Sequence, residues 1–168
     1  CQKILNLVRF YFKDPNPMPK LLINIHHSDA EMRRNLDSRT DAEANRIRRY
    51  LGMDDLSRKD KGPIRELVDN IVKLEQFKDF DIIQIPEIVP ADASFDLFNF
   101  PPDHPARSKS DTYYVDEKNI LRTHTTVMWY YYFQQQEVRA KITANEPLGV
   151  LSHGKVYRKD EIDRNHMN

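Results

Sequence analysis

The sequence predicts an α+β fold, and three observations support that prediction. Apolar residues recur at close to 3.6-residue spacing over residues 63–77, directly after a Gly-Pro pair, which indicates a half-buried helix. The β-branched stretch 82–85 follows this helix and ends at a proline, which indicates a strand. Short strand patterns then flank a helical pattern over residues 111–158. A long helix that leads into an extended strand is therefore the central feature of the expected architecture.

The first 62 residues give a less regular pattern. Apolar runs at 3–12 and 21–25 are separated by DPNPMPK, whose three prolines prevent one helix from crossing the gap. These runs indicate either two strands or a strand and a short helix. The pattern TDAEANRIRRYLG predicts a helix from about Asp41 to Leu51, with Thr40 as its N-cap and Gly52 as its end.

The rest of the chain alternates loops, strands and one helix. Residues 90–110 form a proline-rich connection with a short helix around 93–98. Two short strands are expected at DTYYV (111–115) and NILRT (119–123). A helix capped by Thr125 or Thr126 is expected over 124–142, and a further strand over 147–158.

Composition excludes several classes of protein. The chain has 168 residues, 39% hydrophobic and 31% charged, which suits one compact domain, and it contains no apolar run of the length that spans a membrane. It shows no secretory signal pattern, so we expect a soluble, cytoplasmic protein. Cys1 is the only cysteine, which leaves no internal disulfide and no thiolate zinc site. The formal net charge is zero, with a basic excess in residues 1–62.

Two stretches in the middle of the chain concentrate reactive side chains. In DHPAR (103–107), prolines stiffen a loop from which a histidine and an arginine project. In LRTHTT (121–126), a strand ends where a helix begins, so unpaired backbone N–H groups, Arg122 and His124 meet. This second stretch is either the floor of a polar pocket or a helix cap with a solvent-facing histidine.

The third reactive stretch is GKVYRKDEIDRNH at residues 154–166. Arg158 leaves the expected strand, and the carboxylates of Asp160, Glu161 and Asp163 follow before His166. A guanidinium held by acidic neighbours suits an anionic ligand, because its planar fork can bind two phosphate oxygens. The alternative is an exposed turn with offsetting charges. The aromatic residues at 129–133 point around their helix, so some fill a core and others face a partner.

The order of these stretches resembles the alpha subunits of phenylalanyl-tRNA synthetases, which are class II aminoacyl-tRNA synthetases. HPAR, DT followed by two aromatics, LRTHT and G-x-V-Y-R occur in the family's order between about Pro63 and Asn168. The resemblance implies a class II antiparallel sheet flanked by helices, incomplete in this chain. Residues 63–168 would form part of the catalytic domain, with motif 1 at 63–86 and motif 2 at the end, whereas residues 1–62 receive no role.

The resemblance also assigns the nucleotide side of the site. Arg158 matches the arginine that holds the α-phosphate of ATP and is the catalytic candidate. Asp160 stands where the family often has glutamate, and His166 matches a histidine near the nucleotide phosphates. The main contribution to catalysis would be fixed positive charge that faces the negative charge developing on the phosphate oxygens. Arg158 would supply part of this positive charge and Mg²⁺ the rest.

On the amino-acid side, the resemblance places His124 and Thr126 around the ammonium group of phenylalanine. Tyr114 takes an aromatic position, often tryptophan, beside that substrate. No residue is assigned as a metal ligand. The amino acid would be selected by an apolar ring pocket that offers no partner for a tyrosine hydroxyl.

The implied activity is ATP-dependent activation of L-phenylalanine and its transfer to tRNA(Phe), with no membrane association. Alpha chains of the family pair with beta subunits as two-plus-two assemblies, so the apolar faces of the 63–77 helix and of residues 130–133 are expected to meet partners. The family's returning strand and motif 3 lie beyond this sequence, so the chain alone is expected to be inactive. Two alternatives stay open: a related class II synthetase for another amino acid, such as phosphoserine or pyrrolysine, and a non-catalytic synthetase-like binding module.

Overall fold

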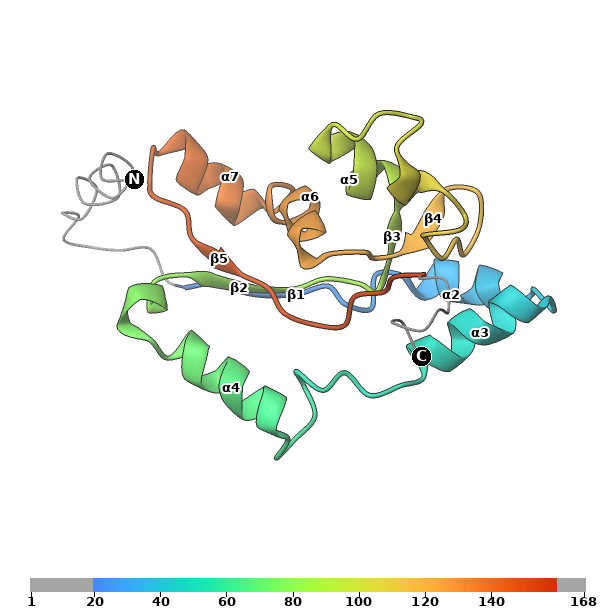
Figure 1. Ribbon diagram of the computed structural model, residues 1–168. Coiled ribbons are helices and arrows are strands. Elements are labelled where there is room, and N and C mark those ends of the chain that lie inside the picture. The colour runs from blue at the N-terminus through green and yellow to red at the C-terminus, as the bar shows by residue number, and fades with distance from the viewer. Residues whose placement is uncertain (1–19, 160–168) are drawn as a thin grey trace.

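A computed structural model describes residues 20–159 and contains two small sheets with helices around them (Figure 1). The first sheet has three strands in the order β1 (Leu22–Asn24), β2 (Asp81–Gln84) and β5 (Val150–Leu151). The second pairs β3 (Ile88–Pro90) with β4 (Asn119–Leu121). The mixed helix-and-sheet class expected from the sequence is confirmed.

Strand direction differs between the two sheets. β3 and β4 pair antiparallel, as expected. The expectation of antiparallel pairing is wrong for the three-stranded sheet, where β2 runs parallel to both β1 and β5. Long segments containing helices connect its successive strands, and such crossovers bring each new strand back in the same direction.

Six α-helices and four short 3₁₀ turns complete the described part of the chain. The helices are α2 (Ala30–Asp37), α3 (Ala42–Leu51), α4 (Pro63–Val72), α5 (Ala91–Phe95), α6 (Met128–Tyr132) and α7 (Gln136–Thr143). The 3₁₀ turns are η1 (Glu75–Phe77), η2 (Asp96–Phe98), η3 (Pro105–Arg107) and η4 (Thr125–Val127). Figure 1 shows α6 and α7 on one side of the three-stranded sheet and α4 on the other.

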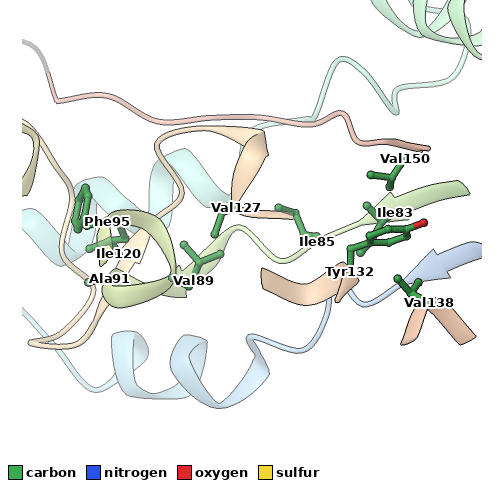
Figure 2. Close-up of a cluster of buried hydrophobic side chains, with 11 residues drawn as sticks. Ile83, Ile85, Val89, Ala91, Phe95, Ile120, Val127, Tyr132, Val138 and Val150 are labelled. Atoms are coloured by element: carbon green, nitrogen blue, oxygen red, sulfur yellow. The ribbon is translucent and has the colours of Figure 1, made fainter. Parts of the chain in front are cut away.

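Buried side chains form two cores that share the β3–β4 sheet. Figure 2 shows the larger core, in which side chains of β2, β3, α5, α6 and α7 meet. The smaller core lies where α2 and α3 cover the opposite face. Side chains alternate along a strand, so Val89 enters the first core while its neighbour Ile88 enters the second. Each fully buried aliphatic side chain of this size stabilises the fold by roughly 2 kcal/mol.

Helix α3 lies where it was predicted, with a different cap. The side chain of Asp41, not Thr40, accepts a hydrogen bond from the Ala44 N–H at 3.0 Å. Hydrogen bonds from Arg39 and then from this N–H lower the pKa of Asp41 to about 2. Gly52 ends the helix as expected. Helix α2 was not predicted, because only one of its residues, Leu36, is buried and the sequence shows no apolar period.

Helix α4 begins at Pro63 as predicted but ends at Val72, before the η1 turn. None of its residues is buried. Its apolar side chains face outward instead, with exposed fractions of 44% for Ile64, 55% for Leu67 and 40% for Ile71. The half-buried helix expected from the periodicity therefore presents an uncovered apolar stripe.

The single helix expected over residues 124–142 is instead η4, α6 and α7, with extended backbone at Gln135. The side-chain amides of Gln134 and Gln135 donate to the carbonyl oxygens of Tyr130 and Tyr131 at 2.8 and 2.9 Å. These donors replace the backbone N–H groups that a continuing helix would supply, so the break leaves those carbonyls satisfied.

Two strand predictions hold only in part. Residues 119–121 form β4, but residues 111–115 contribute only an isolated bridge between Tyr114 and Ile120. The strand expected over 147–158 is limited to Val150–Leu151. Among residues 20–159, no helix has the length and apolar character needed to cross a bilayer.

Candidate functional site

The segment that carries Arg158 lies beside the segment that leads to His124. The Tyr157 N–H donates to the carbonyl oxygen of Arg122 at 3.0 Å, and the Lys159 N–H donates to that of Asp111 at 3.0 Å. Arg158 itself is exposed and lies past the end of β5, so the expectation that a strand carries it is not met. Individual hydrogen bonds to neighbouring loops hold the segment in place of a strand ladder.

Arg122 is the residue that ties these segments together. Its side chain is fully buried. Its Nε donates to the carbonyl oxygen of Lys155 at 2.6 Å, and its Nη1 donates to those of Ile85 at 2.9 Å and Pro86 at 3.3 Å. Burial lowers the pKa of Arg122. One guanidinium thus joins the end of the β2 region to the segment that positions Arg158.

Gly154 makes room for this guanidinium. A Cβ atom at position 154 would lie 2.2 Å from Nη2 of Arg122 and 3.1 Å from Oδ2 of Asp55, which is too close for any side chain. The backbone of Gly154 has φ +146°, a region that other residues rarely adopt. Both facts make glycine necessary at this position.

A second polar cluster centres on the carboxylate of Glu87. It accepts hydrogen bonds from the Tyr157 hydroxyl at 2.8 Å and the Arg33 guanidinium at 3.1 Å, and it pairs with Lys155 Nζ at 2.9 Å. Burial opposes its charged form, but the hydrogen bonds from Lys155 and Tyr157 outweigh burial and lower the pKa of Glu87. Burial and the neighbouring Glu87 raise the pKa of Tyr157. Glu87 therefore holds both Lys155 and Tyr157 in place.

A third cluster joins His153 to the loop after α3. Its Nδ1 lies 2.8 Å from the hydroxyl oxygen of Ser57, whose hydroxyl donates to Asp55 at 2.7 Å. Burial and then the nearby Arg58 lower the pKa of His153, which favours the neutral imidazole. Asp55 also accepts a hydrogen bond from the Lys155 N–H at 3.3 Å. The segment around Gly154 is consequently held from both sides.

Arg158 lines a groove of about 1250 Å³ between α3 and residues 154–159. The other lining residues are Arg46, Arg49, Tyr50, Met53, Asp54, Asp55, Leu56, Ser57, Ile64, Ser110, Tyr113, Gly154, Lys155, Val156, Tyr157 and Lys159. Arginines and lysines outnumber carboxylates in this set. The groove is therefore suited to an anion with several charges.

His124 and Thr126 lie together on another part of the fold. The Thr126 hydroxyl and His124 Nδ1 are 2.5 Å apart, and His124 Nε2 lies 3.3 Å from the carbonyl oxygen of Ser94. The ring of Phe98 meets the imidazole edge-on, with 5.0 Å between the ring centres. The histidine is held on both nitrogens, in agreement with a fixed polar group at the end of β4.

Tyr114 is held by the η3 turn. Its hydroxyl donates to the carbonyl oxygen of Arg107 at 2.8 Å, and burial raises its pKa. Arg107 in turn donates to the Phe100 carbonyl oxygen at 2.6 Å, so the DHPAR loop supports Tyr114 instead of projecting into solvent. His104 accepts a hydrogen bond from the Ala106 N–H at 3.1 Å.

The structure thus brings together some of the sequence-derived site residues. His124 contacts Thr126, while Arg158 lies in a groove whose lining includes none of His124, Thr126 and Tyr114. Asp160 and His166 lie outside the described residues. Sequence reasoning marked Arg122 as part of either a pocket floor or a helix cap, and it missed the roles of Glu87 and Gly154. The only signals for these were a glutamate directly after a strand-ending proline and a glycine next to a charged stretch.

The chain resembles a known family as well as individual known proteins. The family model described as tRNA synthetases class II core domain (F) matches residues 50–168. The phenylalanine–tRNA ligase alpha subunit of Malacoplasma penetrans is 38% identical over 104 residues, which are 62% of this chain and 29% of the relative. The alpha subunit of the same name from Petrotoga mobilis is 35% identical over 121 residues, or 71% of this chain and 31% of the relative.

The match to these curated relatives spans about three tenths of their length. Among solved structures, PylSc, a pyrrolysyl tRNA synthetase from Desulfitobacterium hafniense, aligns with 89% of this chain and 58% of its own at 18% identity and a TM-score of 0.47. The family model covers more than half of the chain and includes Arg122, His124, Gly154 and Arg158. The chain accordingly belongs to the family of class II tRNA synthetase core domains.

Proposed function

We propose that this chain is part of the alpha subunit of a phenylalanine–tRNA ligase. The complete enzyme would activate L-phenylalanine with ATP and transfer it to tRNA(Phe). Relatives that match the chain carry this name, and the residues that the family model matches, 50–168, include the LRTHT and G-x-V-Y-R stretches. Residues 63–168 would belong to the catalytic domain, although the family match already starts at residue 50. Residues 1–62 would be an N-terminal region to which no catalytic role is assigned, and their described part adds β1 to the sheet and α2 and α3 to the smaller core.

The observation that carries the proposal is the position of Arg158. Its guanidinium lines a large groove rich in positive charge, and its segment is fixed by the buried Arg122 and by Glu87 through Tyr157. A cation whose supporting residues are already ordered can stabilise a growing negative charge without reorganisation during the reaction. This preorganisation is what attack on an α-phosphate requires.

The residues of the groove fit ATP better than they fit a metal ion. Arg158 lies on one side of it and brings a guanidinium that suits phosphate oxygens, whereas the ammonium groups of Lys155 and Lys159 are paired with Glu87 at 2.9 Å and Glu43 at 2.6 Å. Within residues 20–159, no group of three or more His, Cys, Asp or Glu side chains is arranged to hold a metal. Mg²⁺ would therefore come to the site with ATP.

In the proposed reaction, a phenylalanine carboxylate oxygen attacks the α-phosphorus in line and pyrophosphate leaves. Arg158 would hold the α-phosphate and stabilise the charge on its oxygens, so no protein nucleophile is needed. Asp160 and His166 are proposed to contact the nucleotide from the following loop. A ribose hydroxyl of the tRNA would then attack the phenylalanyl carbonyl carbon, and AMP would leave.

His124 and Thr126 are proposed to surround the ammonium group of phenylalanine, with Tyr114 beside the substrate. The contacts of His124 to Thr126 and to the Ser94 carbonyl support this, because they fix the imidazole before a ligand arrives. Tyr114 is similarly fixed through its hydroxyl. Fixed polar groups of this kind can orient an amino group.

The proposed partners follow from the exposed apolar surfaces. The outward stripe of α4 and the exposed side chain of Phe133, at 44%, are unusual for a surface that meets only water. We place the beta subunit and the second alpha chain of a two-plus-two assembly at these surfaces, and the enzyme in the cytoplasm, where tRNA is charged.

The test uses the enzyme assembled from a complete alpha chain that contains this sequence and its beta subunit. Arg158→Ala should reduce phenylalanine-dependent exchange between ATP and pyrophosphate by about 100-fold or more, as removal of one charge-stabilising donor typically does. Arg34→Ala, which removes an exposed arginine on α2, is the matched control. Near-normal exchange in the Arg158 variant refutes its phosphate role. Exchange driven by another amino acid instead of phenylalanine overturns the specificity.

A further inference from the structure

The segment that carries Arg158 is anchored at every second residue. Lys155, Tyr157 and Lys159 are buried or half-buried. Val156 and Arg158, which lie between them, are exposed. Side chains alternate between the two sides of an extended backbone, so the three anchored residues share one side and Arg158 lies on the other. The direction in which the guanidinium of Arg158 leaves the backbone is therefore set by the contacts that hold its neighbours.

The C-terminal end of helix α3 holds the first of the two lysines. The ammonium group of Lys155 donates to the carbonyl oxygens of Tyr50 at 3.2 Å, Leu51 at 3.4 Å and Met53 at 2.6 Å, at the end of α3 and in the turn after it. A cation at this end of a helix satisfies carbonyls that lack intrahelical partners and complements the helix dipole. Lys155 thus joins the segment of Arg158 to the end of α3.

The N-terminal end of α3 holds the second lysine. The ammonium group of Lys159 pairs with the carboxylate of Glu43 at 2.6 Å and donates to the carbonyl oxygen of Lys109 at 2.6 Å. Glu43 lies in the first turn of α3, where the helix dipole also favours a carboxylate. The side chains of Lys159 and Glu43 are only 24% and 31% exposed, so salt screens this pair less than a fully exposed one.

The distances along the segment and along the helix match. The backbone from residue 155 to 159 spans about 13 Å when extended, and residues 43 to 51 rise about 12 Å along a helix. The segment therefore runs alongside α3 in the opposite direction, with Arg158 between the two attachments. Most of α3, including Glu43, precedes the residues that match the family model, 50–168. The support for Arg158 thus comes in part from outside the matched family domain.

We propose that α3 holds Arg158 in position and that Glu43, acting through Lys159, is a positioning residue for the activation step. The assignment rests on the proposed function of Arg158. Arg158 and Lys159 line the groove and Glu43 is not among its lining residues, so Glu43 acts on the nucleotide only through these neighbours. A shift of about 1 Å in a catalytic group can cost about 100-fold in rate, so the loss of one of several anchors should cost about tenfold.

The experiment measures phenylalanine-dependent exchange between ATP and pyrophosphate in the complete alpha–beta enzyme. Glu43→Ala should lower kcat/KM for ATP by about tenfold and leave the KM for phenylalanine unchanged, because His124 and Thr126 lie on another part of the fold. Glu43→Gln keeps an oxygen acceptor for Lys159 and should recover most of the loss. Glu31→Ala is the matched control with the wild-type rate, because Glu31 occupies the same position in the first turn of α2 and is exposed.

Two further measurements distinguish positioning from a general loss of stability. In an Arg158→Ala background, Glu43→Ala should have no further effect on the exchange rate, because no guanidinium is left to position. A general loss of stability would instead lower the rate equally in both backgrounds. Hydrogen–deuterium exchange at the backbone N–H groups of Tyr157 and Lys159 should be at least about threefold faster in Glu43→Ala than in Glu31→Ala, since these hydrogen-bonded groups report local opening of the segment.

The outcomes separate this inference from the proposed function. Equal rates in Glu43→Ala and Glu31→Ala overturn the positioning role, and so does a tenfold loss that persists in the Arg158→Ala background. A near-normal rate in Arg158→Ala alone refutes the phosphate role of Arg158 and, with it, the step on which Glu43 acts. If the wild-type enzyme shows no exchange with phenylalanine, the proposed function fails, and hydrogen exchange at Tyr157 and Lys159 still decides whether α3 holds the segment.

Discussion

At the scale of single residues, the most constrained position is the contact between Arg122 and Gly154. A fully buried guanidinium reaches three carbonyl oxygens, and its Nη2 has no hydrogen-bond partner within the described part of the chain. A buried cation is costly unless its donors are satisfied, so the surrounding backbone must be held in one arrangement. The glycine allows that arrangement, and the segment with Arg158 follows directly from it.

Gly154→Ala should destabilise the chain strongly. The added Cβ would lie 2.2 Å from Nη2 of Arg122, and the positive φ alone costs roughly 1–3 kcal/mol. Urea unfolding followed by circular dichroism measures the loss. Gly52→Ala is the control, because φ there is −76° and the new Cβ would make only ordinary contacts. Equal stability of the two variants would contradict the close packing described for Arg122.

The residue types at the site were readable from the sequence, but their environments were not. LRTHTT marked Arg122 and His124 as polar groups at the end of a strand, and both are held by hydrogen bonds there. Arg122 is buried against the backbone of residues 85, 86 and 155, whereas Arg158 is exposed. Packing between segments distant in sequence decides this, and no local pattern records it.

At the scale of elements, α4 combines the strongest periodic pattern with the poorest burial. Its apolar residues follow the helical period, yet none is buried, because no element within residues 20–159 covers that side. The pattern therefore predicted the helix correctly, but it did not predict that the apolar side of the helix would be exposed. An uncovered stripe of this kind is expected where a partner packs.

Leu67→Glu should alter assembly and leave the stability of the isolated chain almost unchanged. Leu67 is 55% exposed, and substitutions at such positions usually change the free energy of unfolding by less than about 0.5 kcal/mol. A charge in a covered apolar interface should instead weaken association by about tenfold or more, measured by sedimentation of the alpha–beta enzyme. Ile142→Glu on α7, at 48% exposure, is the matched control. Identical assembly of both variants would show that α4 faces water.

Other elements show where local patterns lose to tertiary contacts. Residues 124–142 carry a continuous helical pattern, but the chain turns at Gln135 so that α7 can place Val138 and Lys141 inside the fold. The predicted strand at 147–158 has only two residues in a ladder, since Lys155 and Tyr157 further along it form hydrogen bonds with Arg122 instead. In both places a contact between residues far apart in the sequence outweighs the local secondary-structure propensity.

At the scale of the whole molecule, one buried carboxylate joins four parts of the chain. Asp81 on β2 accepts hydrogen bonds from the Leu21 N–H at 2.8 Å and from the Tyr132 hydroxyl at 2.5 Å. It also pairs with Lys141 of α7 at 3.0 Å, with exposed side-chain fractions of 1% and 8%. The entry to β1, the central strand and both helices above the sheet thus meet at one charge. This cluster fixes how α6 and α7 sit on the sheet.

Lys141→Met should therefore destabilise the chain by about 3–5 kcal/mol, because it leaves the carboxylate of Asp81 buried without its cation. Adding Asp81→Asn should recover part of that loss, since the second change removes the charge that the first left unpaired. Urea unfolding of the two variants gives the comparison. Lys78→Ala, which breaks a solvent-exposed pair with Glu75, should have no measurable effect. If Lys141→Met loses no more stability than Lys78→Ala, the buried pair does not hold α7 to the sheet.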